Sequence, residues 1–341
     1  MKKIIGFDGR VLNNKNLSGV ERYALELNRR FMKLNNSITL KPKQKLNFVA
    51  DHLWYYTLLP ILLRNYSVNT LFCPANIAPF NLNRKIKLAT TIHDVNFLKF
   101  PKMYSKLFLE YYKFVIPRII SRSDAIITIS KSSMDDIISF FPNSRTKINV
   151  SYIGVTDDVS NIDQKKKRQI LCVSSFYKGK NIPGLIKSFQ KIKHLIPHNL
   201  ILVGSFNNNV SADLDIKKCI DQEDRIIIKS NISNTELNFL YNTSEIFVLP
   251  SFYEGFGMTP IEAMKCGAAV IASNHKTIME VCSDAAFYFD PYNIDDMSKC
   301  MLKICFDEKK RRELILNGKK RALFFNLDNS FKNVMNVVNS I

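Results

Sequence analysis

Short apolar segments rich in Ile and Val alternate with longer segments of helical periodicity along the whole chain, and this alternation restricts the fold more than any other feature. Nearly continuous apolar runs of four to seven residues are typical of strands that helices cover on both faces of a parallel sheet. The sequence therefore predicts an α/β protein built from repeated βα units. The predicted strands are residues 3–8, 70–73, 87–93, 125–130 and 148–153, and then 169–174, 199–204, 225–229, 245–250, 268–273 and 285–290.

Chain length and one polar segment indicate two domains. A single hydrophobic core rarely grows beyond about 250–300 residues, and this chain has 341. Residues 158–168, "DVSNIDQKKKR", are charged and without periodicity, which is typical of a linker. We therefore expect an N-terminal domain over residues 1–157 and a C-terminal domain over 169–325. A last amphipathic helix over 326–341 could pack back on the N-terminal domain.

Apolar runs and cysteines favour a cytoplasmic protein. The longest apolar run, residues 53–63, contains Pro60 and is shorter than the roughly 18 residues that a membrane span needs. The first residues lack the apolar core of a signal peptide. No C-x-x-C pair or metal-ligand spacing occurs among the cysteines, so we expect buried reduced thiols. The seven cysteines are Cys73, Cys172, Cys219, Cys266, Cys282, Cys300 and Cys305.

Positive charge is concentrated in the first part of the chain. Residues 1–150 hold 24 Lys and Arg against 9 Asp and Glu, whereas residues 151–341 hold 25 against 21. This asymmetry predicts an anionic partner such as nucleic acid, an anionic membrane or a phosphorylated substrate, although it could serve solubility alone. Aromatic and basic residues mix in segment 100–120. That segment could face a membrane or an acceptor, or could form an ordinary half-buried helix.

The segment "SFYEGFGMTPIEAMKCGAAVIAS", residues 251–273, follows a predicted buried strand and carries the chemistry that we regard as most informative. Ligands of open α/β sheets bind at the carboxyl ends of the strands. Gly255 and Gly257 would let backbone N–H groups approach a ligand. Thr259 to Glu262 reads as a capping box with proline at the first helical position, and the helix would stop at Gly267.

Two carboxylates frame this turn. The cap alone could explain Glu262, but it cannot explain Glu254, which lies in a glycine turn before a helix N-terminus. Carboxylates that accept from sugar hydroxyls, beside backbone donors for phosphate, predict a site for a nucleotide sugar.

The segment "VLPSFYEGFGMTPIEAMKCGAAVIAS" also resembles the E-x7-E segment of the family 4 retaining glycosyltransferases, which have the GT-B fold. Further segments that are similar to this family cover nearly the whole chain. They are "FDGRVLNNKNLSGVERYALEL", "TTIHDVNFLKFP", "DAIITISKSSMDDI", "KINVSYIGV", "CVSSFYKGKNIPGLIKSF" and "ISNTELNFLYNTSEIFVLPS". The resemblance implies two Rossmann-like, doubly wound parallel-sheet domains that face each other across a cleft.

The resemblance also implies roles for donor-site residues. Glu262 would hold the ribose hydroxyls, Glu254 would accept from the hydroxyls of the transferred sugar, and Lys180 would neutralise the diphosphate. Backbone N–H groups around Phe256, Gly257, Met258 and Thr259, next to Gly255, would face the sugar and the distal phosphate. Many members have an arginine five residues before this lysine, but this chain has Ser175. Lys180 would therefore neutralise more of the phosphate charge, and Lys178 could replace the missing arginine.

Two further residues belong to the N-terminal half. By resemblance, His93 would hydrogen-bond to the donor sugar at the reacting centre. Gly19, in "SGVERY", matches a loop glycine whose surroundings would meet the diphosphate and the acceptor. The D-x-D motif formed by Asp213 and Asp215 follows an Asn-rich turn and does not close an apolar strand, so we expect no metal there and no cofactor.

The sequence thus predicts a retaining, metal-independent glycosyltransferase. It would move a hexose-type sugar from a GDP- or UDP-linked donor to a glycan or a polyprenyl-diphosphate-linked acceptor. We expect it to be peripheral on the inner face of the cytoplasmic membrane, in synthesis of a bacterial surface polysaccharide such as O-antigen or capsule. The mechanism would be front-face displacement, with double displacement through Glu254 as the other course.

Two other functions stay open. A nucleotide-sugar epimerase or hydrolase of related fold would turn over the donor without an acceptor. A basic nucleic-acid-binding protein would need a recognition motif or a stacking platform, and we find neither, so we expect no nucleic-acid partner.

Overall fold

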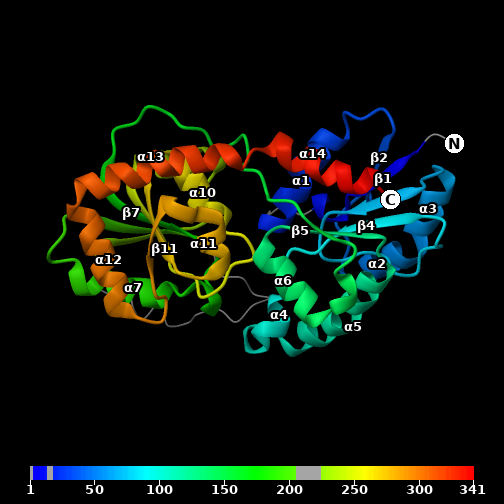
Figure 1. Cartoon of the computed structure of the whole chain (residues 1–341), viewed down its shortest axis with the longest axis horizontal. Helices are drawn as coiled ribbons and strands as arrows, with labels where there is room; N and C mark the ends of the chain where they lie inside the picture. The colour runs from blue at the N-terminus through cyan, green and yellow to red at the C-terminus, as the bar shows by residue number, and fades with distance from the viewer. Residues whose placement is uncertain (1–2, 14–17, 205–223) are drawn as a thin grey trace. The chain divides into compact units, whose positions relative to one another are not determined.

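The computed structural model describes residues 3–13, 18–204 and 224–341, and the chain divides into two compact units (Figure 1). The first unit comprises Met1–Lys99, Lys106–Gly154 and Leu327–Ile341. The second unit comprises Phe100–Ser105 and Val155–Asn326.

The first unit is a six-stranded parallel sheet with helices on both faces. Its strand order is β2 (Ser37–Leu40), β1 (Ile5–Asp8), β3 (Thr70–Cys73), β4 (Lys87–Thr91), β5 (Ala125–Thr128) and β6 (Ile148–Val150). Its helices are α1 (Gly19–Phe31), α2 (Phe48–Leu53), α3 (Leu59–Asn65), α4 (Asn96–Lys99), α5 (Lys106–Arg122), α6 (Lys131–Phe140) and α14 (Leu327–Asn339). A short π-helical segment, Trp54–Leu58, joins α2 to α3.

The second unit is also a six-stranded parallel sheet. Its strand order is β12 (Ala286–Phe289), β11 (Ala269–Ser273), β10 (Ser244–Leu249), β7 (Lys167–Val173), β8 (Asn199–Val203) and β9 (Ile226–Lys229). The described helices are α7 (Ile182–Ile192), α9 (Asn234–Thr243), α10 (Met258–Lys265), α11 (Lys276–Cys282), α12 (Ile294–Phe306) and α13 (Glu308–Phe324). Helix α7 packs on α12 and α10 packs on α13, and the two pairs lie on opposite faces of the sheet (Figure 1).

These observations confirm two parallel sheets of the doubly wound α/β class. One strand, β2, was not predicted, because "SITL" has only two apolar residues and three of its four residues are half-exposed at the edge of the sheet. The predicted strands 87–93, 125–130 and 148–153 end two or three residues early in the structure. Strand β7 begins at Lys167, inside the segment predicted to be the linker, because Lys167 pairs with Ser244 of β10.

The last helix belongs to the first unit. Helix α14 contacts α1 and β5, and it buries Leu327, Val334 and Val338 as its apolar periodicity predicts. The Lys3 ammonium donates to the carbonyl oxygens of Val338, Asn339 and Ile341 at 2.9–3.0 Å. The end of the chain is therefore fixed beside its beginning.

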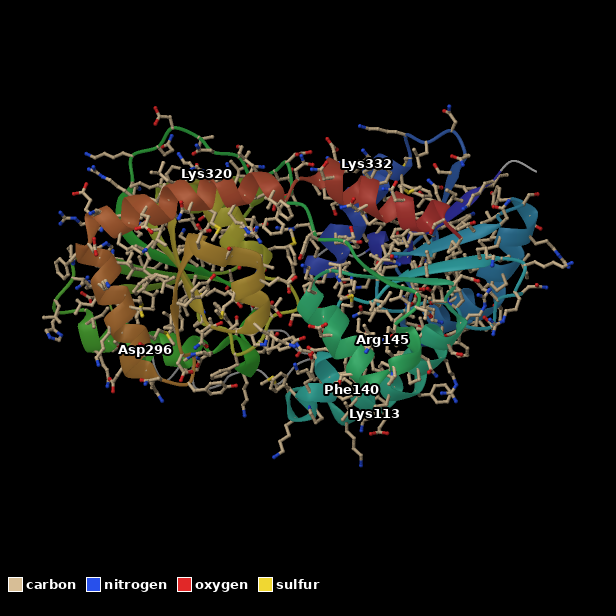
Figure 2. The ribbon with its side chains drawn as sticks, viewed as in Figure 1. Lys113, Phe140, Arg145, Asp296, Lys320 and Lys332 are labelled. Carbon is tan, nitrogen blue, oxygen red and sulfur yellow. The ribbon has the colours of Figure 1, made fainter. Side chains whose placement is uncertain are left out.

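Helix α5, which covers most of segment 100–120, is half-buried. Its inner side buries Val115, Ile116 and Ile119. Leu107 on its outer side is 80% exposed, and Lys113, also exposed, projects from this helix (Figure 2).

Membrane spans and cysteines can be assessed over the described ranges. No helix within them has both the length and the apolarity that crossing a bilayer requires. Six cysteines are buried free thiols, as expected, and Cys219 lies outside the described residues.

Candidate functional site

The strand order of the second sheet creates a ligand-binding position at its centre. Strand β7 lies between β8 and β10, so the chain leaves β7 toward one side of the sheet and leaves β10 toward the other. At such a switch point the two outgoing loops separate and leave a crevice beyond the carboxyl ends of the strands. The loops that begin after Val173 and after Leu249 are the two that meet here.

These two loops hold each other in place. The Phe252 N–H donates to the Gly179 carbonyl oxygen at 3.0 Å. Gly179 lies in a single 3₁₀ turn, Lys178–Lys180, where a Cβ would meet the Tyr177 ring at 2.6 Å. Any side chain at Gly179 would therefore push against the Tyr177 ring beside Lys180.

Lys180 and Glu254 form an ion pair at this crevice. The Lys180 Nζ lies 2.6 Å from the Glu254 Oε1, and the Ser251 hydroxyl donates to the same oxygen at 2.8 Å. Burial alone would lower the pKa of Lys180, but the Glu254 carboxylate and Tyr177 outweigh it, so the pKa lies above the ordinary value for lysine. Lys180 is therefore a fixed positive charge at neutral pH, and its counterion is the neighbouring carboxylate.

Glu262 lies on α10 and is buried, with 2% of the residue exposed. The Tyr241 hydroxyl donates to its Oε2 at 2.7 Å. Tyr241, at the end of α9, is fully buried. A tyrosine hydrogen bond of this length fixes the orientation of the carboxylate. Sequence reasoning missed Tyr241, because only the packing of α9 on α10 brings the two side chains together.

The start of α10 corrects the predicted capping box. The helix begins at Met258, and its N-cap is Gly257 with φ +90° and no side-chain cap. Thr259 is thus the second residue of the helix and cannot cap it, while Glu262 bonds to Tyr241. The left-handed conformation of Gly257 turns the chain sharply into the helix, a geometry that glycine alone adopts at little cost. The helix does end as predicted, with Gly267 at φ +72°.

The second unit brings most of the predicted site residues together. The two loops and the start of α10 carry Ser175, Lys178, Lys180, Glu254, Gly255, Phe256, Gly257, Met258, Thr259 and Glu262. Ser175 and Lys178 are exposed, and the Phe256 ring packs edge-on against Phe325, with centroids 5.5 Å apart. Phe256 therefore has a packing role for its side chain, whatever its N–H group contacts.

His93 and Gly19 lie in the first unit. The ring of His93 is 4% exposed, its Nε2 lies 3.0 Å from the Pro74 carbonyl oxygen, and Tyr23 packs edge-on against it. A carbonyl can only accept, so Nε2 carries the proton and Nδ1 is left as an acceptor. Burial lowers the pKa of His93 to about 4, so the imidazole is neutral at pH 7. Gly19 begins α1, and apart from its chain neighbours and its own helix backbone no described residue comes within 4 Å of where its Cβ would be.

Metal ligands can be assessed for the described ranges only. Within them no group of three or more His, Cys, Asp or Glu side chains could hold a metal ion. The D-x-D residues Asp213 and Asp215 lie outside the described residues.

Comparison with known proteins assigns the family. The model of "Glycosyl transferases group 1" matches residues 156–321, and that of "Glycosyltransferase Family 4" matches residues 42–159. The chain belongs to these glycosyltransferases. The fold of this glycosyltransferase is accordingly GT-B, with one six-stranded parallel sheet in each unit.

Individual relatives agree with this family. The O-antigen chain mannosyltransferase B of Escherichia coli is 26% identical over 288 residues, which cover 80% of this chain and 75% of that protein. The sucrose-phosphate synthase of Thermosynechococcus elongatus superposes with a TM-score of 0.81 at 16% identity, covering 99% of both chains. Anabaena HepE in complex with UDP-glucose superposes with a TM-score of 0.76 at 14% identity, covering 99% of this chain and 100% of HepE.

Proposed function

We propose that this glycosyltransferase moves a hexose-type sugar, with retention, from a nucleotide-diphosphate sugar to a hydroxyl of a glycan or lipid-linked acceptor. The observation that carries the proposal is the Lys180–Glu254 pair at the switch point of the second sheet. A cation held there by a carboxylate, beside the N-terminus of α10, suits a ligand that is both anionic and rich in hydroxyl groups.

Donor binding would replace the internal ion pair. The diphosphate would take over Lys180 as its counterion, and Glu254 would turn its oxygens to the hydroxyls of the sugar. The N–H groups of Met258 and Thr259 would face the distal phosphate, and Glu262, oriented by Tyr241, would accept from the ribose hydroxyls. Lys180 would gain most when the glycosidic bond breaks, because the charge of the leaving diphosphate increases at that moment.

Front-face displacement is the mechanism that we propose. The diphosphate leaves, and one of its oxygens takes the proton of the incoming hydroxyl on the same face of the sugar. The contacts of Glu254 support this choice, because a carboxylate that accepts from the Ser251 hydroxyl at 2.8 Å and, once the donor is bound, from the hydroxyls of the sugar is a weakened nucleophile. A Lys-based site also needs no metal for the diphosphate, so we propose metal-independent transfer.

The relatives support the class of product. The E. coli relative is named an O-antigen chain mannosyltransferase. We therefore propose that this chain acts in assembly of a bacterial surface polysaccharide, and we favour O-antigen over capsule. GDP- and UDP-linked sugars are the donors to compare first. HepE, of the same fold, is known in complex with UDP-glucose.

Thermal stabilisation by nucleotide sugars tests the donor site. A ligand that binds only the folded state raises Tm by mass action. We expect one class among UDP-, GDP-, ADP- and dTDP-sugars to raise Tm, and Lys180→Gln and Glu262→Gln to weaken that rise. Lys187→Gln, an exposed lysine on α7, is the matched control and should keep it.

Two results would count against the proposal. Stabilisation that is equal in the wild type and both site variants would place the nucleotide elsewhere. Conversion of the donor to a new sugar without any acceptor would favour an epimerase or hydrolase.

The surface of the first unit supports peripheral attachment to an anionic membrane. Leu58, Ile61, Leu107 and Phe114 are each more than half exposed, in the part of the chain that carries 24 basic against 9 acidic residues. Each basic residue near an anionic bilayer contributes on the order of 1 kcal/mol. We expect binding to vesicles with anionic lipid that weakens in high salt and with Leu107→Gln, and no binding to zwitterionic vesicles. Equal binding to both kinds of vesicle would exclude this electrostatic attachment.

A further inference from the structure

A polar cavity lies entirely within the first unit, and its lining contains none of the residues discussed above as donor-site candidates. It measures about 280 Å³ and lies between the loops after β1 and β2 and the helix α2. Its polar lining consists of Arg10, Asn13, Gln44, Lys45 and Asp51. The Asn13 side chain donates to the Pro42 carbonyl oxygen at 2.8 Å and so fixes one loop to the other.

Arg10 is held rigidly in the wall of this cavity. Its Nη1 donates to the Asp51 Oδ2 at 2.5 Å, its guanidinium carbon lies 4.6 Å from the centre of the Tyr55 ring, and only 14% of its side chain is exposed. Beneath it, the Asp8 carboxylate accepts from the Arg10 backbone N–H at 3.0 Å and from the Tyr55 hydroxyl at 2.9 Å. The guanidinium orientation is therefore fixed by packing as well as by charge.

The same guanidinium has donors left over. Its Nε is buried and has no hydrogen-bond partner among the described residues. Nη1 is the only side-chain nitrogen of Arg10 for which a hydrogen bond to a described residue is found. An arginine has five N–H donors, and Nε is covered by protein. The donors of Nη2, which form no hydrogen bond to a described residue, are therefore the ones left for a ligand in the cavity.

Charge selects the class of this ligand. The lining contains two cations, Arg10 and Lys45, and one carboxylate, Asp51. Lys45 is exposed and forms no ion pair with a described residue, and Lys41 and Lys43 of the same loop are exposed as well. A fixed guanidinium with the exposed Lys45 in the same lining suits the oxygens of a phosphoryl group.

We propose that this cavity binds a phosphoryl group of the acceptor. The inference rests on the proposed function, since it gives the acceptor an anionic anchor in the first unit. The cavity follows β1 at the carboxyl edge of its sheet, and His93 follows β4 at the same edge. The phosphoryl group would come from a lipid diphosphate or from a phosphorylated saccharide. Leu53, two residues after Asp51, is 63% exposed and would suit the lipid.

The test uses inorganic pyrophosphate as the probe in a Lys180→Gln background, so that the donor site no longer attracts it. We expect pyrophosphate to raise Tm in this background. Adding Lys45→Gln should weaken pyrophosphate binding about tenfold, the effect of one charge-assisted contact. Lys45 is exposed, so its replacement leaves folding intact, whereas Arg10→Gln would remove the half-buried contact with Asp51. Lys85→Gln, at another exposed lysine of the first unit, should leave binding unchanged.

The outcomes separate this inference from the proposed function. If Lys180→Gln alone abolishes all pyrophosphate binding, or if Lys45→Gln and Lys85→Gln have equal effects, the cavity is not an anion site. If pyrophosphate binding depends on Lys45 while no nucleotide sugar stabilises the wild type, the anion site stands and the donor proposal fails. Farnesyl diphosphate and glucose 1-phosphate distinguish the two sources. Tighter binding of the former, dependent on Lys45, assigns the lipid diphosphate, and tighter binding of the latter assigns the saccharide.

Discussion

Lys178 and Lys180 are two residues apart in one 3₁₀ turn, yet their surroundings differ completely. Lys178 is exposed, whereas the Lys180 side chain is 16% exposed and paired with Glu254. At the scale of single residues, this difference decides which lysine can act on a buried diphosphate, because a desolvated charge interacts far more strongly than a solvated one.

Lys180→Gln should lower kcat/KM about 10²- to 10³-fold, as for the loss of one buried donor to a developing anion. Lys178→Gln should lower it less than about fivefold, since exposed charges contribute little. Steady-state kinetics with the donor identified by thermal shift measure both variants. Equal losses would show that both lysines contact the phosphate, so that Lys178 can take the role expected of Lys180.

His93 makes stability depend on pH. Its pKa in the folded chain is about 4, below the ordinary value near 6.5, so the unfolded chain binds a proton that the folded chain does not. Above pH 6.5 His93 is neutral in both states and does not favour unfolding. As the pH falls toward 4, protonation of His93 in the unfolded chain lowers the free energy of unfolding. Between pH 7 and pH 5 this one group should lower the free energy of unfolding by about 2 kcal/mol.

Urea unfolding of the wild type and of His93→Gln at both pH values isolates this contribution. Gln can still donate to the Pro74 carbonyl oxygen but does not titrate. A pH dependence that is identical in the two proteins would mean that folding does not lower the pKa of His93.

At the scale of elements, the local sequence pattern predicts helix α10 correctly but places its first residue wrongly. Thr259 and Glu262 have the spacing of a capping box, but the helix begins at Met258, with Gly257 in a left-handed conformation before it. The tertiary contact of Glu262 with Tyr241 replaces the local one. A buried hydrogen bond to a tyrosine and a sharp glycine turn together outweigh the cap preference of one threonine.

Gly257→Ala should therefore destabilise the protein by about 1–3 kcal/mol, because φ is +90° and the new Cβ would meet the Ile278 Cδ1 at 2.6 Å. Gly19→Ala, at a helical position where no other described side chain comes within 4 Å of the new Cβ, should be neutral or stabilise by up to about 1 kcal/mol. Thermal unfolding compares them. Equal stability of the two variants would contradict the left-handed turn before α10.

At the scale of the whole molecule, the chain returns to the unit in which it began. Helix α14 packs on α1 and β5, Lys3 bonds to its last carbonyl oxygens, and Arg30 pairs with Asp328 at 2.7 Å. Buried apolar side chains contribute most of this stability, since an exposed ion pair adds little.

Val334 and Val338 of α14 are fully buried, so replacing either by Ala should lower the free energy of unfolding by about 1–3 kcal/mol. Lys332→Ala, at an exposed position of the same helix labelled in Figure 2, is the control and should change it by less than about 0.5 kcal/mol. Circular dichroism during thermal unfolding measures all three variants. Valine variants as stable as the control would show that α14 does not stabilise the first unit.

The sequence by itself determined the α/β class, eleven of the twelve strands found in the described residues, the turn at Gly267 and the amphipathic end of the chain. All of these depend on neighbouring residues, whose periodicity and backbone preferences are local properties. The family resemblance also followed from short contiguous motifs. The edge strand β2 was not predicted, because its half-exposed residues show little apolar periodicity.

Only the tertiary structure decided which distant side chains meet. Lys180 and Glu254 are 74 residues apart and contact each other because β7 pairs with β10 as well as with β8, the strand that follows it in the chain. The contacts of Tyr241 with Glu262 and of Arg10 with Asp51 arise in the same way, from the packing of separate elements. Strand order and helix packing minimise the free energy of the whole core, so no local pattern of residues can specify these contacts.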